Sequence, residues 1–144
     1  MKAASFVLLL FATAAGWAGD LQGVKAEPNL ERRSDRALDN ANRAISEARD
    51  AYAANDLEKS KAALQETVAS VELSFEALEG TGKHPRSSPK HFKKAELSVR
   101  EMLRRLKGLE TDFNVDERPL LVATEERLQA VHERLIDGLM SKKK

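Results

Sequence analysis

Between residues 92 and 113, apolar residues recur at alternating steps of three and four. They are Phe92, Ala95, Val99, Met102, Leu106, Leu109 and Phe113. This spacing gathers the apolar side chains on one face of an α-helix, whereas in a β-strand it would scatter them over both faces. Ser88 and Pro89 suit the start of such a helix. The segment therefore predicts an amphipathic helix over residues 89–113 that buries one face.

Three other segments show the same period, at residues 29–54, 56–79 and 117–141. Their apolar positions are Ala37, Ala41, Ala44, Ala48 and Ala51; Leu57, Leu64, Val68, Val71, Phe75 and Leu78; and Leu121, Leu128, Val131, Leu135 and Leu139. Residues that favour turns separate the four, at 55–56, 80–82 and 114–116. Aromatic strand formers are scarce, at 5% of the chain. We therefore expect an all-α domain over 29–141, folded as an antiparallel four-helix bundle with up-down-up-down topology.

The N-terminal stretch has the layout of a secretory signal peptide. Lys2 precedes an apolar run, and small residues at Gly16 and Ala18 suit cleavage after Ala18. The run is too short for a membrane span of ~20 residues, and no later segment is apolar enough to cross a bilayer. Residues 1–18 are thus predicted to be a signal peptide, residues 19–28 a flexible leader and residues 142–144 a basic tail.

The absence of cysteine limits both the chemistry that the protein can perform and the compartments in which it is expected. Without Cys there are no disulfides, Cys-based zinc sites, iron–sulfur clusters or thiol nucleophiles. Small secreted eukaryotic domains usually carry disulfides. The sequence therefore favours a bacterial protein that is periplasmic or secreted.

Charge is strongly segregated along a nearly neutral chain of 24 basic and 23 acidic residues. Residues 81–108 hold nine basic residues against two acidic ones, whereas residues 56–79 and 109–137 are acidic overall. One interpretation is that the basic third helix pairs with its acidic neighbours in sequence and so specifies helix packing. The other is that the basic loop 81–94 and the third helix bind a protein or an anionic envelope component. Candidate contacts are Lys83, Arg86, Lys90, Lys93, Lys94, Arg100 and Arg104.

Two leucines, Leu73 and Leu97, fall opposite the apolar faces of their helices. If they lie near each other in the fold, they form a small apolar patch suited to a partner or a second subunit. Nucleic acid is not an expected partner, because the chain has few aromatic residues for base stacking and is predicted to be exported.

Catalytic and metal-binding patterns are weak. None of the three histidines has a Glu three residues before it, H-E-x-x-H is absent, and no serine lies in a G-x-S-x-G elbow. We therefore predict a non-catalytic protein with no metal or cofactor. An alternative is a bundle that binds a small ligand, haem or metal through His132, with Met102 as a second haem ligand. An enzyme with an unrecognised site is a third alternative.

Residues 52–60, Tyr-Ala-Ala-Asn-Asp-Leu-Glu-Lys-Ser, resemble the bend between the two helices of a tetratricopeptide repeat. The pattern does not recur 34 residues later, as that family requires. The resemblance therefore implies a helical hairpin here and no function.

Overall fold

The computed structural model describes residues 21–141, and within this range it contains five α-helices and no strand. The predicted signal peptide at 1–18, the first two residues of the leader and the basic tail at 142–144 lie outside the described residues. The all-α prediction is confirmed. None of the five helices is long and apolar enough to span a membrane.

The four long helices lie close to the predicted ranges. They are α2 (Leu30–Ala53), α3 (Leu57–Gly80), α4 (Lys90–Leu109) and α5 (Arg118–Met140). Asn29 and Asp56 cap α2 and α3, each accepting a hydrogen bond from the backbone N–H three residues later. Between them, Asn55 has a φ of 59°, in the left-handed region that Asn tolerates.

The structure differs from the prediction of a flexible leader, because residues Leu21–Ala26 form a short helix, α1. Val24 of α1 is buried, and α1 packs against α2. The backbone carbonyl of Glu27 accepts a hydrogen bond from Arg33 Nε at 2.8 Å. A six-residue helix anchored by one apolar side chain is too short to show a period in sequence, which is why the pattern did not predict it.

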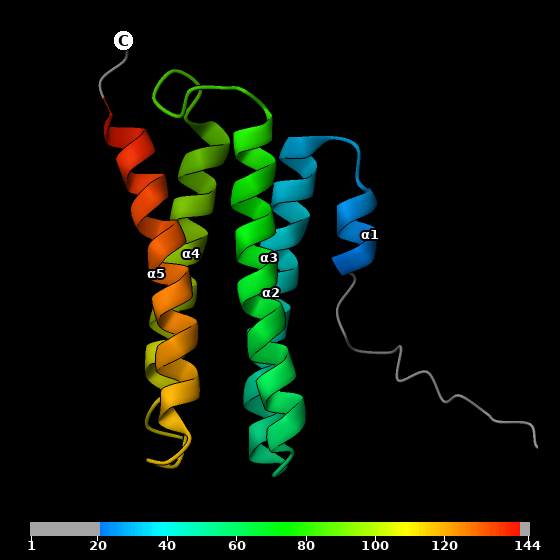
Figure 1. The fold of residues 1–144 in the computed structure, drawn as a ribbon, viewed down its shortest axis with the longest axis vertical. Helices are drawn as coiled ribbons and strands as arrows, with labels where there is room; N and C mark the ends of the chain where they lie inside the picture. Colours follow the sequence, from blue (N-terminus) through cyan, green and yellow to red (C-terminus); the bar gives the residue numbers. More distant parts are fainter. Residues whose placement is uncertain (1–20, 142–144) are drawn as a thin grey trace, which may run out of the picture.

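The four long helices lie side by side, and the chain direction alternates from each one to the next (Figure 1). Their order around the core is not the order in sequence. α4 packs most extensively on α5 and next on α2, whereas its contact with α3 is slight. Neighbours α2–α3 and α4–α5 are therefore antiparallel, while α3–α5 and α2–α4 are parallel. α4 was expected to pack against both of its neighbours in sequence, α3 and α5. This expectation is wrong for α3, which α4 contacts only slightly.

Arg105 gives a physical reason for this order. Its guanidinium donates to the side chain of Asn42 at 3.0 Å and to the hydroxyl of Ser46 at 2.7 Å, both on α2. These bonds hold α4 beside α2. The segment 81–89 that joins α3 to α4 is nine residues long, which is enough to cross the end of the bundle diagonally.

Small residues bring α2 and α3 closer together than any other pair of helices. On each helix they recur at steps of three and four and are buried: Ser34, Ala37, Ala41, Ala44, Ala48 and Ala51 on α2, and Ser60, Ala63, Thr67, Ser70, Ser74 and Ala77 on α3. The buried hydroxyls are satisfied across the seam, as when Asn40 donates to Ser70 at 2.8 Å. The sequence predicts the alanine half of this seam and misses the serine half.

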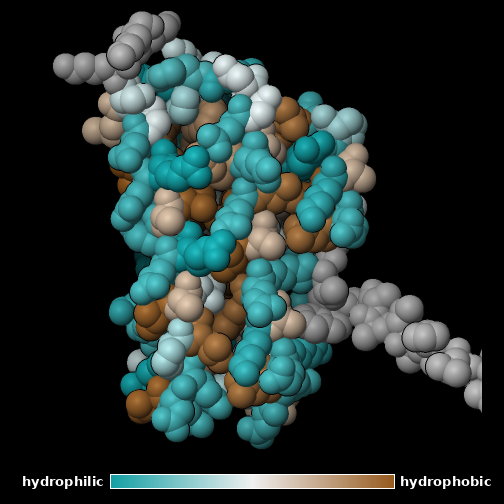
Figure 2. Space-filling view, in the orientation of Figure 1, coloured by the Kyte–Doolittle hydropathy of each residue, from teal (hydrophilic) through white to brown (hydrophobic). Residues whose placement is uncertain are grey.

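Larger apolar side chains from α2, α3, α4 and α5 fill the single core, among them Ile45, Leu78, Met102, Leu106 and Leu128. The outer surface is mostly polar, with apolar residues visible between the polar ones on the face in Figure 2. A hollow between α3 and α5 has apolar walls from Leu64, Val68 and Leu120.

Candidate binding groove between the last two helices

Two hollows lie between α4 and α5 on the outside of the bundle, and we call the two together the α4–α5 groove. Its upper hollow, at the end where segment 81–89 lies, has a volume of about 590 Å³. It is lined by Arg86, Pro89, Lys93, Glu96, Leu97, Arg100, Ile136, Leu139 and Met140. The structure thus brings together four of the residues that the sequence singled out: Arg86, Lys93, Leu97 and Arg100.

The upper hollow combines exposed apolar side chains with a cationic rim. Leu97 is 57% exposed, Met140 76% and Ile136 37%. Arg86 donates to the backbone carbonyl of Ser141 at 3.1 Å, and no carboxylate among residues 21–141 pairs with Lys93. Apolar side chains exposed together in a hollow mark a surface that gains free energy when a partner covers it.

A buried carboxylate forms part of the floor of the upper hollow. Glu96 is 6% exposed, and it accepts a hydrogen bond from Nε of Arg100 at 3.1 Å. Nε2 of His132, on α5, lies 3.2 Å from the same carboxylate oxygen. Groups from both helices therefore contact this carboxylate, and the net charge of the residues that line the hollow is positive.

The lower hollow of the groove is acidic, with a volume of about 540 Å³. It is lined by Leu103, Lys107, Val122, Glu125, Glu126, Gln129, Ala130 and Glu133. Burial first, and then the neighbouring Glu110 carboxylate, raise the pKa of Glu125 to about 7. Nζ of Lys107 lies 3.0 Å from Glu110, and this contact raises the pKa of Lys107.

The other part of the predicted basic cluster faces α2 instead of the groove. Glu31 contacts Lys83 and also lies 2.8 Å from Nε2 of His91. The hydrogen bond from Lys83 lowers the pKa of Glu31. Asp35 lies 3.2 Å from Nζ of Lys94. Acids of α2 therefore neutralise this side, so the sequence cluster splits into a paired half and an open half.

Three other candidates lie outside the upper hollow. Lys90 is exposed and borders a separate small hollow with Glu31 and Lys83. Arg104 is exposed and pairs with Glu101 of its own helix. Leu73 is half-buried on α3, a helix that contributes no residue to the groove, so the structure does not join it to Leu97.

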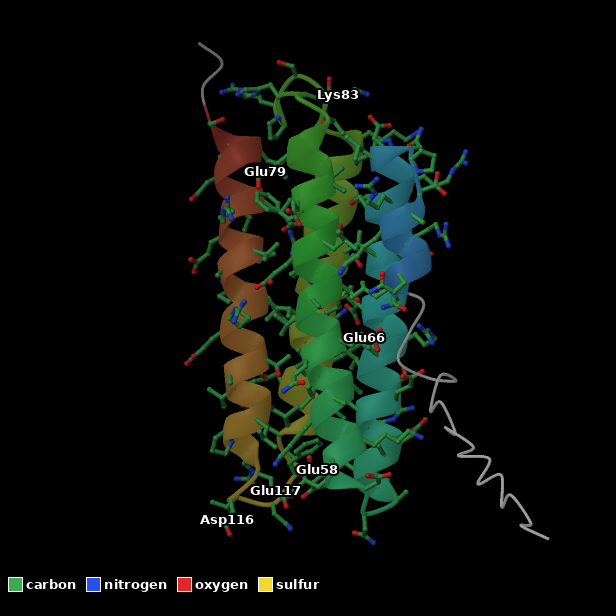
Figure 3. All side chains as sticks on the ribbon, turned by 45° about the vertical axis from the view of Figure 1, so that its right-hand side comes forward. Glu58, Glu66, Glu79, Lys83, Asp116 and Glu117 are labelled. Atoms are coloured by element: carbon green, nitrogen blue, oxygen red, sulfur yellow. The ribbon has the colours of Figure 1, made fainter. Side chains whose placement is uncertain are left out.

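Charge also differs between the two ends of the bundle. Lys83 lies in the segment above α3, whereas Asp116 and Glu117 lie at the opposite end, near Glu58 (Figure 3). There the hydroxyl of Tyr52 accepts a hydrogen bond from the backbone N–H of Asn114 at 2.8 Å and donates to Glu117. This acidic end has a structural role, because it fastens the segment after α4 to α2.

Sequence reasoning missed Ile136, Leu139 and Met140 as part of the site. Ile136 and Met140 do carry a signal, because both lie off the buried face defined by Leu121, Leu128 and Leu135. Without knowing that α4 and α5 are neighbours, these residues cannot be joined to Leu97.

His132 and Met102, the groups proposed for a metal or haem, are both buried. Within residues 21–141, no three His, Asp or Glu side chains are grouped to hold a metal ion. Met102 is fully buried among core residues, and His132 contacts Glu96. Nδ1 of His132 has no hydrogen-bond partner in the described part of the chain.

Comparisons of the chain with protein-family models, curated proteins and solved structures found no match. The function is therefore argued from the groove itself.

Proposed function

We propose that this is an exported, non-catalytic helical protein that binds an acidic protein partner through the α4–α5 groove. The observation that carries the proposal is the upper hollow. There, Leu97, Ile136 and Met140 are exposed together beside Arg86, Lys93 and Arg100.

The chemistry of the hollow defines the partner. Removing apolar surface from water contributes about 25 cal/mol per Å², from which the entropy cost of association is subtracted. The cationic rim favours a partner whose apolar residues are flanked by Asp or Glu, and it increases the rate of encounter with such a partner. An amphipathic helix with acidic edges has this pattern and fits a groove between two helices.

Export is the second part of the proposal, and it is supported by the sequence of residues 1–18. A short apolar run follows Lys2, and small residues precede the predicted cleavage point after Ala18. Mass spectrometry of the protein from fractionated cells tests it. We expect a chain that begins at Gly19 in the envelope or secreted fraction, and a full-length chain in the cytoplasm would contradict export.

Site-specific photo-crosslinking tests the binding site. A photoreactive amino acid replaces exposed Leu97 in cells that normally make the protein, and the control variant carries it at exposed Ala62 on α3. We expect a defined protein adduct from position 97 and none from position 62. Adding Lys93→Glu and Arg86→Glu to the protein with the photoreactive residue at position 97 should remove the adduct. An adduct that is insensitive to these reversals, or equal adducts at both positions, would contradict the proposed site.

An anionic membrane surface is the main competing partner for the groove. Vesicles in which about one-third of the lipid molecules are anionic distinguish a membrane partner from a protein partner. We expect no cosedimentation that depends on Leu97, because the apolar side chains line a hollow and do not form a projecting face. Cosedimentation lost on Leu97→Ser would assign the groove to lipid instead.

One observation favours a second candidate function, a small-ligand site at His132. This residue is 9% exposed, and its Nδ1 has no partner within residues 21–141. Because Nε2 donates to Glu96, Nδ1 is an acceptor, and a ligand that supplies a hydrogen-bond donor or a metal would satisfy it. The absorption spectrum and metal content of protein purified from its native cells test this candidate, with His132→Phe as the matched variant.

A further inference from the structure

We infer that the groove binds a second copy of this chain, related to the first by a two-fold axis that runs parallel to the helices. The inference rests on the proposed function and names the partner. Its basis is a complementarity between the two walls of the groove, which a two-fold axis of this orientation brings face to face.

The α4 wall of the groove is basic. Lys93, Arg100 and Lys107 line it at intervals of seven residues, which places them in one row along the helix. Arg100 contacts Glu96 and Lys107 contacts Glu110 of the same chain, but their side chains remain 63% and 75% exposed. A continuous cationic row thus runs along the α4 wall.

The α5 wall carries an acidic row with the same spacing. Glu126 and Glu133 are exposed and seven residues apart. The arginines of α5 do not neutralise this row, because Arg127 and Arg134 turn toward α3, where they pair with Glu72 and Glu79. The groove therefore has one basic and one acidic wall.

The two hollows set the level of α4 against α5, because the upper one contains Leu97 with Ile136 and the lower one contains Lys107 with Glu126. Because the two helices are antiparallel, residues farther along α4 lie beside earlier residues of α5. Leu97 then lies level with Ile136, Arg100 with Glu133 and Lys107 with Glu126.

A two-fold axis parallel to the helices lays α4 of one copy over α5 of the other at the same level. Leu97 then meets Ile136 of the second copy, and Arg100 meets Glu133 of the second copy. Each contact occurs twice, as in any isologous interface. An axis across the helices would instead lay basic α4 over basic α4, so charge selects the first arrangement.

The face is large enough for a dimer. Helices of 20 and 23 residues are about 30 Å long. Two such helices side by side present a face about 20 Å wide, which corresponds to about 1,200 Å² of total buried surface, at the lower end of stable interfaces. We therefore expect a dimer that dissociates at low micromolar concentration and is weakened by salt.

Charge reversal with rescue tests the pairing. Sedimentation velocity of the mature protein should show a dimer. We expect Glu133→Arg to raise the dissociation constant at least 10-fold and Arg100→Glu/Glu133→Arg to restore it toward the original value. Glu76→Arg, at an exposed site on α3, is the matched control and should leave it unchanged. A wild-type protein that stays monomeric at 100 µM, or a double variant without rescue, would overturn the inference.

Engineered cysteines test the geometry without relying on charge, because the chain has no cysteine of its own. A mixture of Leu97→Cys and Ile136→Cys proteins should form a mixed disulfide dimer faster than either variant links to itself. A mixture of Met140→Cys and Val122→Cys proteins should not, because these positions lie at opposite ends of the groove. Preferential linkage of that second pair would overturn the proposed axis.

The two proposals fail differently. A monomeric protein whose position 97 still crosslinks to another protein in cells leaves the proposed function intact and overturns the second copy as partner. If the only adduct at position 97 has twice the mass of the chain, both proposals are supported.

Discussion

Nε2 of His132 lies 3.2 Å from Oε1 of Glu96, and both residues are less than one-tenth exposed. The contact joins α4 to α5 directly beneath the upper hollow of the groove. A buried carboxylate is costly unless donors surround it, and here His132 and Arg100 provide them from the two helices. The pair therefore fixes the distance between the two walls of the groove.

Removing both partners should destabilise the protein by less than the sum of the two single removals. His132→Leu leaves Glu96 with Arg100 only, and Glu96→Leu leaves the imidazole unpaired, so each should cost about 1–3 kcal/mol. The double variant should cost less than the sum, because no buried polar group is then left without its partner. Urea unfolding of the four proteins measures the coupling, and additive single effects would show that the contact contributes nothing.

The close approach of α2 and α3 should make their seam sensitive to added volume. Ala41 is fully buried between the two helices. Ala41→Leu adds three carbon atoms where no space exists, so we expect a loss of about 1–3 kcal/mol in unfolding free energy. Ala62→Leu, at an exposed site on α3, is the control and should change stability by less than about 0.5 kcal/mol. Equal effects at both sites would contradict tight packing of the seam.

Periodicity alone predicted the four long helices, because each buries one face and the spacing of apolar residues records that face. It did not predict the serine half of the α2–α3 seam. Ser60, Ser70 and Ser74 are polar by composition, yet they are buried with their hydroxyls bonded across the helices. Such residues are recognised only when the opposite helix, with its alanines, is known to lie against them.

The order of the helices was the other feature beyond the reach of the sequence. Charge counted by segment favoured α3 as a neighbour of α4, but Glu31 and Asp35 of α2 are the acids that meet the basic cluster. Segment 19–55 has a net charge near zero, which hid these two carboxylates. The sequence could single out Lys93 and Leu97, which line the upper hollow, because the exposed face of α4 is recognised without knowing its neighbours.

Phe113 should be important for stability although it lies beyond the end of α4. The sequence placed it inside a helix that ends at Leu109 in the structure, yet it is only 2% exposed. Its ring stacks on Tyr52 with the centroids 3.7 Å apart. We expect Phe113→Ala to cost about 3–5 kcal/mol. Thermal unfolding of the variants measures this loss of stability. Val115→Ala, two residues later and 71% exposed, is the control and should be nearly neutral.

The carboxyl of Glu125 should make stability depend on pH. Burial and the neighbouring Glu110 raise its pKa from 4.5 to about 7, and Lys107 opposes this shift. Between pH 4.5 and pH 7 the folded protein binds the proton of Glu125 more tightly than the unfolded chain does. The contribution of this proton to stability is therefore greatest below pH 4.5 and is lost as the pH rises toward 7. Glu125→Gln cannot ionise, so it should stabilise the protein near neutral pH by about 1 kcal/mol, a value reduced by partial exposure to solvent.

Urea unfolding across this pH range measures the effect of Glu125, with Glu126→Gln as the matched control. Glu126 is adjacent in sequence but exposed, so its amide variant should retain the pH dependence of the original protein. In Glu125→Gln the decline of stability above pH 4.5 should be smaller than in the original protein. A parallel profile for Glu125→Gln would mean that the Glu110–Glu125 pair is fully solvated. The lower hollow would then carry its full negative charge at neutral pH and offer a stronger partner for the basic wall of α4.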